Sequence, residues 1–259
     1  MMPSVVNIEL TSRCNANCWF CGRRKMEREH PELCDWGDME WPMVHLLACQ
    51  VPPGTLVQLH NSGEPTLYPL LGHALRVFPH CIRQFDTNGK LIVEKAEEII
   101  GNLDVLTISV CQGEETEDQY ETVVKFLERK GDRKPRLVYR LLGKVENVGR
   151  WQELPGLVAT RTLHDPRGSF DYQKTPTVPE HGICLDLLSH LAVDRYGNIS
   201  LCVRFDPEGK LRLGNIRNMT LEEAFHGTKR RDYLQKHIEG RRGECPGCDR
   251  CHFYGVPIG

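Results

Sequence analysis

The sequence has no long hydrophobic run, no internal repeat, no low-complexity tract and almost no charge imbalance. A membrane-spanning helix needs about 18 or more apolar residues in succession, so no membrane span is expected. The start, MMPSVVNIELTSRC, has no basic flank followed by an apolar stretch, so we expect no secretory signal and a cytoplasmic location. With 33 Lys and Arg against 35 Asp and Glu, the net charge of −2 gives no overall reason to bind nucleic acid.

Cysteine, in contrast, is abundant, with 12 residues in a chain of 259. A disulfide framework is typical of short secreted chains, whereas clustered cysteines in a reducing compartment indicate metal ligation. Most of the cysteines fall in two tight groups and one looser pair; the remaining four are scattered singly. The groups are Cys14, Cys18 and Cys21; Cys245, Cys248 and Cys251; and the pair Cys184 and Cys202.

Short apolar runs alternate with amphipathic ones over the first 165 residues. This alternation predicts parallel β/α units, because parallel neighbours need crossover helices. A closed eight-stranded barrel needs about 250 residues, so an open, partial (β/α)6 barrel over residues 1–165 is expected. A proline-rich connection over 166–182 leads to a small domain over 183–259, with a β-hairpin and a helix. The expected strands are 5–10, 56–60, 82–87, 104–110, 136–142 and 157–162, and the hairpin strands are 187–194 and 198–203. The expected helices are 41–49, 68–78, 92–100, 114–130, 149–154 and 220–238.

The segment CNANCWFC places Cys14, Cys18 and Cys21 directly after the first expected strand. Three thiolates on one short loop can ligate three irons of a cubane cluster and leave the fourth iron open for a small molecule. A structural zinc site is the alternative, but it needs a fourth ligand, and the nearest candidate is the distant Cys34.

A second motif, NSGEPTLYP, follows the second strand at its carboxyl end, where barrel enzymes keep their chemistry. Gly63 would allow close backbone approach to a ligand. Glu64 would offer a carboxylate to a cationic amino group. Standing alone, the tripeptide Gly63-Glu64-Pro65 (the GEP motif) could be an ordinary strand-to-helix turn, but its position after the cysteine motif favours a ligand site.

In this order of motifs the sequence resembles the radical S-adenosylmethionine (SAM) enzymes, from residue 5 to about 162. The resemblance implies a 4Fe–4S cluster whose open iron binds SAM, reductive cleavage of SAM to a 5′-deoxyadenosyl radical, and abstraction of a substrate hydrogen. Cys14, Cys18 and Cys21 would be the cluster ligands. The SAM contacts would be Phe20, Ser62, Gly63, Glu64, Pro65, Asn88 and Ser109. Ser62 stands where the commoner GGEP motif has glycine, and Cys111 replaces a frequent aspartate near the pocket.

The C-terminal cysteines form a discontinuous set, with two that frame the expected hairpin and others in CPGCDRC. This layout resembles the SPASM/twitch extension of many radical SAM enzymes. With fewer cysteines than a full SPASM domain, it implies one auxiliary 4Fe–4S cluster, with a zinc site as the alternative. The expected ligands are Cys184, Cys202, Cys245 and Cys248, with Cys251 spare or replacing Cys248.

A fully ligated auxiliary cluster suits electron acceptance. The expected function is therefore dehydrogenation of a polar small molecule, which can be anionic, with an electron donor such as flavodoxin or ferredoxin. Arg167 and Arg204 are candidate substrate contacts near the barrel mouth, and Cys111 is a third candidate site residue. Alternatives are a peptide maturase or epimerase, an RNA-modifying enzyme suggested by the basic run 229–242, and a metal-stabilised binding module. The interpretation as a peptide maturase is disfavoured because no peptide-recognition segment is expected before the first strand, 5–10.

Overall fold

The computed structural model describes residues 2–113, 116–161, 183–203, 206, 209–249 and 251. Its centre is a nine-stranded sheet in the order β6-β5-β4-β3-β2-β1-β7-β8-β9. The strands β1 to β6 pair in parallel with their sequence neighbours, which confirms the open six-unit barrel. Their bounds are Val5–Ile8, Leu56–Gln58, Ile82–Thr87, Val105–Cys111, Arg136–Leu142 and Leu157–Arg161.

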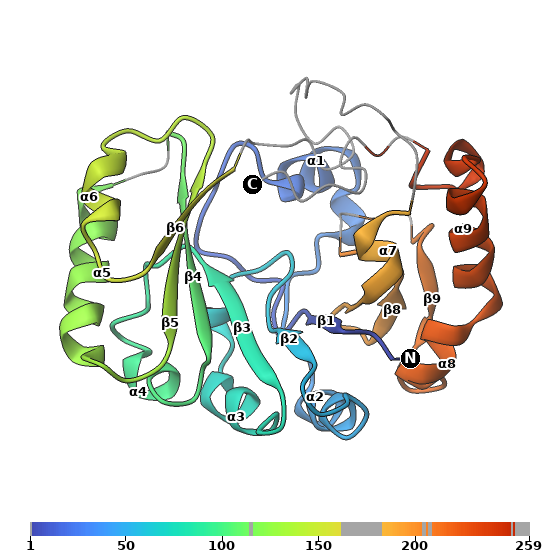
Figure 1. The fold of residues 1–259 in the computed structure, drawn as a ribbon, viewed down its shortest axis with the longest axis horizontal. Helices are drawn as coiled ribbons and strands as arrows, with labels where there is room; N and C mark the ends of the chain where they lie inside the picture. Colours follow the sequence, from blue (N-terminus) through green and yellow to red (C-terminus); the bar gives the residue numbers. More distant parts are fainter. Residues whose placement is uncertain are drawn as a thin grey trace.

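The crossover helices pack on one face of these strands. Alternate strand residues such as Val6, Val57, Phe85, Leu106 and Tyr139 are buried there in one continuous hydrophobic core. The intervening residues therefore face the concave interior of the open barrel. Figure 1 shows α5 and α6 at one end of the molecule and α8 and α9 at the other. The helices of this part are α1 (Gly22–Glu29), α2 (Trp41–Ala48), α3 (Leu71–Arg76), α4 (Ala96–Ile99), α5 (Glu117–Lys130) and α6 (Val148–Gln152), with 3-10 turns η1 (Pro31–Leu33) and η2 (Pro65–Leu67).

The C-terminal part continues the barrel sheet instead of forming a separate one. The strand β7 (His190–Val193) pairs in parallel with β1, and the antiparallel strands β8 (Asn198–Ser200) and β9 (Arg212–Asn215) follow. The hairpin therefore starts later than predicted, because 185–189 is the helix α7 (Leu185–Ser189). Two more helices, α8 (Leu221–His226) and α9 (Thr228–Ile238), and the 3-10 turn η3 (Arg242–Glu244) complete this part.

The predicted single helix over 220–238 is wrong in one respect, because it breaks at Gly227. Thr220 and Glu223 form a reciprocal capping box at the start of α8, as the Thr-x-x-Glu spacing favours. No helix within the described ranges is long and apolar enough to cross a membrane.

Candidate functional site

The loop from Cys14 to Cys21 joins β1 to α1 and presents three half-buried thiols. The backbone N–H of Cys21 donates to the carbonyl of Cys18 at 3.1 Å, and the N–H of Ala16 donates to the Cys14 sulfur at 3.4 Å. Burial raises the pKa of the Cys21 thiol, although the backbone N–H and charge of Arg23 oppose the rise. The loop thus holds its cysteines by local turns.

The loop that carries Ser62, Gly63 and Glu64 packs directly against the segment that leads into the cysteines. The N–H of Glu64 donates to the Arg13 carbonyl at 2.8 Å. A Cβ on Gly63 would meet the carbonyl oxygens of Thr11 and Arg13, the latter at 2.8 Å, so only glycine fits. Glycine is therefore required at position 63 because the protein's own backbone lies close to it. From the sequence, we had expected that a ligand would make this close approach.

Glu64 is 2% exposed, and its carboxylate is surrounded by donors from the protein. Oε1 accepts hydrogen bonds from Thr66 N (3.1 Å), Thr66 Oγ1 (2.6 Å) and Thr87 Oγ1 (2.7 Å). Oε2 accepts from the N–H of Asn88 at 2.8 Å. Burial raises the pKa of Glu64, and these hydrogen bonds limit the rise. The carboxylate thus ties the loop after β2 to the end of β3.

The other residues expected at SAM lie around the same edge of the sheet. The Asn88 side chain donates to Asn15 of the cysteine loop at 2.7 Å. The Gln119 amide donates both to the Asn88 carbonyl (2.8 Å) and to the Ser109 carbonyl (3.0 Å). The structure therefore brings the ends of β3 and β4 next to the cysteine loop.

The aromatic residues of the cysteine loop reach the end of β4. Trp19 and Phe20 pack edge to face with ring centroids 5.5 Å apart, and the Trp19 indole N–H donates to the Gln112 carbonyl at 3.4 Å. Cys111, the last residue of β4, is buried. Pro65 is buried too and begins η2.

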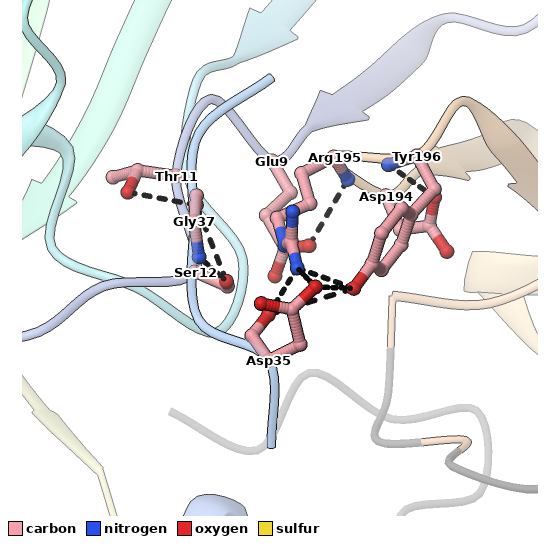
Figure 2. A network of polar contacts seen from close by, with 8 residues as sticks. All are labelled: Glu9, Thr11, Ser12, Asp35, Gly37, Asp194, Arg195 and Tyr196. Atoms are coloured by element: carbon pink, nitrogen blue, oxygen red, sulfur yellow. Dashed lines mark hydrogen bonds and ion pairs between the residues drawn. The ribbon is translucent and has the colours of Figure 1, made fainter. Parts of the chain in front are cut away.

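Glu9 connects this edge to the C-terminal part. It follows β1, is 5% exposed, and its Oε1 accepts from the hydroxyl and N–H of Ser62. Its Oε2 accepts from the N–H of Arg195, in the turn after β7, at 3.1 Å. Burial raises the pKa of Glu9, and the Ser62 and Arg195 hydrogen bonds oppose this. Figure 2 shows this contact beside the Arg195 guanidinium, which lies between Asp35 and the Tyr196 ring.

The four cysteines expected to hold an auxiliary cluster lie in or against one small hydrophobic core. Cys184, Cys202 and Cys248 pack against a small core that contains the fully buried Cys245 and Tyr233. Burial, together with the thiols of Cys248 and Cys245, raises the pKa of Tyr233 to about 12. Cys251 is not part of this core as the structure describes it; its N–H donates to the Cys248 carbonyl at 3.2 Å, and its carbonyl accepts from Arg242 at 3.1 Å.

Neither thiol group is spaced for a single metal ion. Among the residues that the structure describes, no three His, Cys, Asp or Glu side chains form such a group. Tetrahedral zinc, with bonds to sulfur of about 2.3 Å, needs ligand sulfurs within about 4 Å of one another. Both groups consist of cysteine thiols, the donor type that holds 4Fe–4S clusters.

A cavity of about 640 Å³ links the two cysteine groups. Its wall includes Cys21 from the first group and Cys202 from the second. Glu9, Ser62 and Arg195 also line it. A molecule in this cavity would therefore be in contact with both cysteine regions. The predicted substrate contacts Arg167 and Arg204 lie outside the described residues. Glu9 and Arg195 were not predicted from the sequence. The segment D-R-Y-G-N, which contains Arg195, indicated only a hairpin turn.

The concave face of the barrel carries a polar network below this edge. Asp86 forms an ion pair with Arg140 and accepts from Gln84 Nε2 at 2.6 Å, and His60 Nε2 lies 3.4 Å from it. Although burial opposes it, His60 and Arg140 hold the pKa of Asp86 below its usual value. Arg140 is also the register partner of Ser109, so sequence reasoning missed a cation beside an expected SAM contact.

Comparison with known proteins bears on both parts of the chain. Residues 184–252 match the family model of the SPASM iron–sulfur cluster-binding domain. Over 261 aligned residues, the chain is 24% identical to the S-adenosyl-L-methionine-dependent 2-deoxy-scyllo-inosamine dehydrogenase of Niallia circulans, covering 98% of this chain and 94% of that protein. The chain is a radical SAM enzyme with a SPASM-type domain.

The fold of this chain is similar to those of two solved structures. BtrN in complex with AdoMet and 2-DOIA matches with a TM-score of 0.60 and 19% identity, over 97% of this chain and 93% of that one. Streptococcus suis SuiB bound to the precursor peptide SuiA matches with a TM-score of 0.64 and 13% identity, over 97% and 71%. The cofactors of the enzyme are SAM, a SAM-binding 4Fe–4S cluster and an auxiliary 4Fe–4S cluster.

Proposed function

We propose that this radical SAM enzyme oxidises a hydroxyl group of a polar small molecule by two electrons, with the auxiliary cluster as the electron acceptor. The observation that carries the proposal is a cavity with both Cys21 and Cys202 in its wall. A substrate held there would contact the region of SAM cleavage and the region of the second cluster together. The similarity to a SAM-dependent dehydrogenase along nearly the whole of both chains supports the same reaction class.

Oxidation of an alcohol to a carbonyl removes one carbon-bound hydrogen atom, one proton and one electron. When bound, SAM on the first cluster would supply the hydrogen abstraction and the auxiliary cluster would take the electron. Cys14, Cys18 and Cys21 would hold the first cluster. Cys184, Cys202, Cys245 and Cys248 would hold the second, with Cys251 as the alternative to Cys248. Phe20, Ser62, Gly63, Pro65, Asn88 and Ser109 stay the proposed SAM contacts, and Glu64 acts by positioning the loop.

The hydroxyl proton needs an acceptor within the cavity wall, and we assign this role to Glu9. A general base works best when its pKa lies near the working pH. Burial raises the pKa of Glu9 toward that range, and the hydrogen bonds from Ser62 and Arg195 keep the carboxylate in one orientation. Ser62 thus has a use that glycine could not serve, because its hydroxyl donates to Glu9.

The dimensions of the cavity favour a small molecule over a peptide. Pockets for small ligands are about 300–1,000 Å³, and this cavity lies within that range. Arg195 and Arg212 line it and could contact an anionic or hydroxyl group of the substrate. The first cluster would receive its electron from a donor such as flavodoxin or ferredoxin.

The test uses anaerobically reconstituted enzyme with SAM, dithionite and 2-deoxy-scyllo-inosamine as the first probe. We expect 5′-deoxyadenosine and, with an accepted probe, a product two mass units lighter. Release of S-adenosylhomocysteine would indicate methyl transfer and contradict the proposal. Glu9→Gln should retain SAM cleavage but lose product formation by at least about a hundredfold, which is the low end of the usual contribution of a general base. Equal product formation would remove Glu9 from the reaction.

A further inference from the structure

Two arginines in the wall of the proposed substrate cavity have no carboxylate partner within the described ranges. They are Arg23 and Arg212. The third arginine of the wall, Arg195, is paired with Asp35 at 3.0 Å. The wall also contains five carboxylates, and each has a partner in the protein: Glu9 with Ser62 and Arg195 N–H, Glu32 with His30, Asp35 with Arg195, Asp194 with Tyr196 and Asn198, and Asp206 with Lys210 and Leu211.

Arg23 is a buried cation at the cysteine end of this cavity. It lies two residues after Cys21, is 7% exposed and lines the cavity. Its guanidinium carbon lies 3.9 Å from the centroid of the Trp36 ring, and one terminal nitrogen donates to the Ser12 carbonyl. Its Nε has no partner among the residues that the structure describes. Stacking on Trp36 therefore holds the guanidinium in place but supplies no anion to balance its charge.

Arg230 shows how the same fold satisfies a buried guanidinium without an anion. It is 5% exposed, and its guanidinium carbon lies 3.6 Å from the centroid of the Phe225 ring. Its three nitrogens donate to the backbone carbonyls of Leu187 (3.2 Å), Phe225 (2.9 Å) and Leu188 (2.7 Å). Arg23 has one such carbonyl in place of three, and it borders a cavity. Because a buried charge is costly unless it is paired and hydrogen-bonded, Arg23 is suited to a ligand that brings an anion.

We propose that Arg23 is a substrate-binding residue that holds a carboxylate or phosphate group of the substrate, with Arg212 as a second cationic contact. The N–H groups of a guanidinium match the geometry of both anions. Arg212 begins β9, so the two arginines come from the cysteine loop side and from the C-terminal part of the same cavity. This inference rests on the proposed function and names the charge class of its substrate.

The experiment measures binding to the anaerobic, SAM-loaded holoenzyme without reductant, by isothermal titration calorimetry at low ionic strength. The probes are inorganic phosphate, D-gluconate and D-sorbitol; D-sorbitol is the uncharged match of D-gluconate. We expect at least one of the two anions to bind the wild type, and D-sorbitol to bind more weakly. Arg23→Met removes the charge and keeps an unbranched side chain, so Kd for that anion should rise about 10- to 150-fold.

Arg212→Gln and Arg217→Gln form a matched pair. Both replace an exposed arginine and change the net charge equally, but Arg217 is paired with Glu40 at 2.9 Å and does not line the cavity. Arg212→Gln should raise Kd by less than Arg23→Met, because solvent screens an exposed charge, and Arg217→Gln should leave Kd unchanged. If Arg23→Met does not fold or bind iron, Arg23→Lys replaces it. The lysine keeps the charge but loses the planar set of donors, so Kd should still rise, by a smaller factor.

Four results would overturn the assignment. The first is that neither anion binds the wild type, and the second is that D-sorbitol binds as tightly as the anion. The third is an unchanged Kd in Arg23→Met (or Arg23→Lys), or an equal rise in Arg217→Gln. The fourth is a parallel loss of SAM affinity in Arg23→Met, because Arg23 would then hold the carboxylate of SAM. Failure of the proposed function is detected separately, as absence of 5′-deoxyadenosine when dithionite is added to the same preparation.

Discussion

Replacing Glu64 by Gln separates a positioning role from direct contact with SAM. The carboxylate accepts four hydrogen bonds, and three of them come from Thr66 and Thr87. The fourth comes from the backbone N–H of Asn88. In Glu64→Gln an NH2 group takes the place of one oxygen, so it meets either the Asn88 N–H or the Thr66 N–H, donor against donor.

The magnitude follows from these contacts. A buried donor left without an acceptor costs about 1–3 kcal/mol, and the remaining hydrogen bonds lose the strength that the negative charge gave them. We therefore expect a loss of about 2–3 kcal/mol in the free energy of unfolding, which lowers the melting temperature by about 5–10 °C for a chain of this size. Because Asn88 lies at the displaced loop, SAM affinity should fall in the same variant.

The assay pairs thermal unfolding with SAM binding, each for Glu64→Gln and for Thr66→Val. The valine variant removes one hydroxyl donor and leaves the carboxylate, so its losses should be smaller and in the same proportion. Weaker SAM binding by Glu64→Gln with an unchanged melting temperature would refute this reasoning, because it would mean that the carboxylate contacts SAM instead of the loops.

Three further predictions concern cluster content, backbone packing and acid stability. Reconstituted enzyme should contain about eight irons and eight sulfides per chain by iron and sulfide assay. The variant with Cys14, Cys18 and Cys21 all changed to Ala should keep about four of each. Zinc in the C-terminal site would contradict the account. Gly63→Ala should cost about 1–3 kcal/mol in urea unfolding, because the new Cβ meets backbone oxygens that cannot move aside, and an unchanged midpoint would refute this. Burial would raise the pKa of Asp104, but Arg83 and Lys134 bring it to about 2. The ionised Asp104 therefore contributes to the free energy of unfolding above its ordinary pKa of about 3.9, and this contribution is lost as the pH falls toward 2. Asp104→Asn should lower the free energy of unfolding by about 1–2 kcal/mol at pH 7. Urea titrations of this variant should show a stability that changes less between pH 4 and 2 than that of the wild type.

Local sequence signals were sufficient to predict most strands of the barrel. The strands over 82–87 and 136–142 were predicted with the bounds that the structure gives, because each is a short run bounded by turn residues. The helix Gly22–Glu29 was not predicted, since GRRKMERE has no apolar stripe with helical spacing. The pairing of β7 with β1 could not be predicted either, because nothing in 190–193 distinguishes a barrel strand from the first strand of a separate hairpin.

The site residues also fall into two sets: those that a local motif predicts and those that depend on long-range contacts. Cysteine spacing and the GEP motif sufficed to place the residue types at the right edge of the sheet. Several contacts of Gly63 and Glu64 are made with backbone atoms of Thr11, Arg13 and Asn88, which are 24 to 52 residues distant in the chain. Glu9 has no motif around it; only the folded strand β1 and the turn after β7 bring it to the cavity wall.

The most direct test of the central claim, that one cavity serves both clusters, uses Cys184→Ala combined with Cys202→Ala. The measurement is the ratio of oxidised product to 5′-deoxyadenosine, with a substrate that the wild type accepts. We predict that the double variant still forms 5′-deoxyadenosine, because Cys14, Cys18 and Cys21 are untouched, while the ratio falls at least about tenfold below that of the wild type. An unchanged ratio would contradict the account, because the substrate electron would then have an acceptor other than the auxiliary cluster.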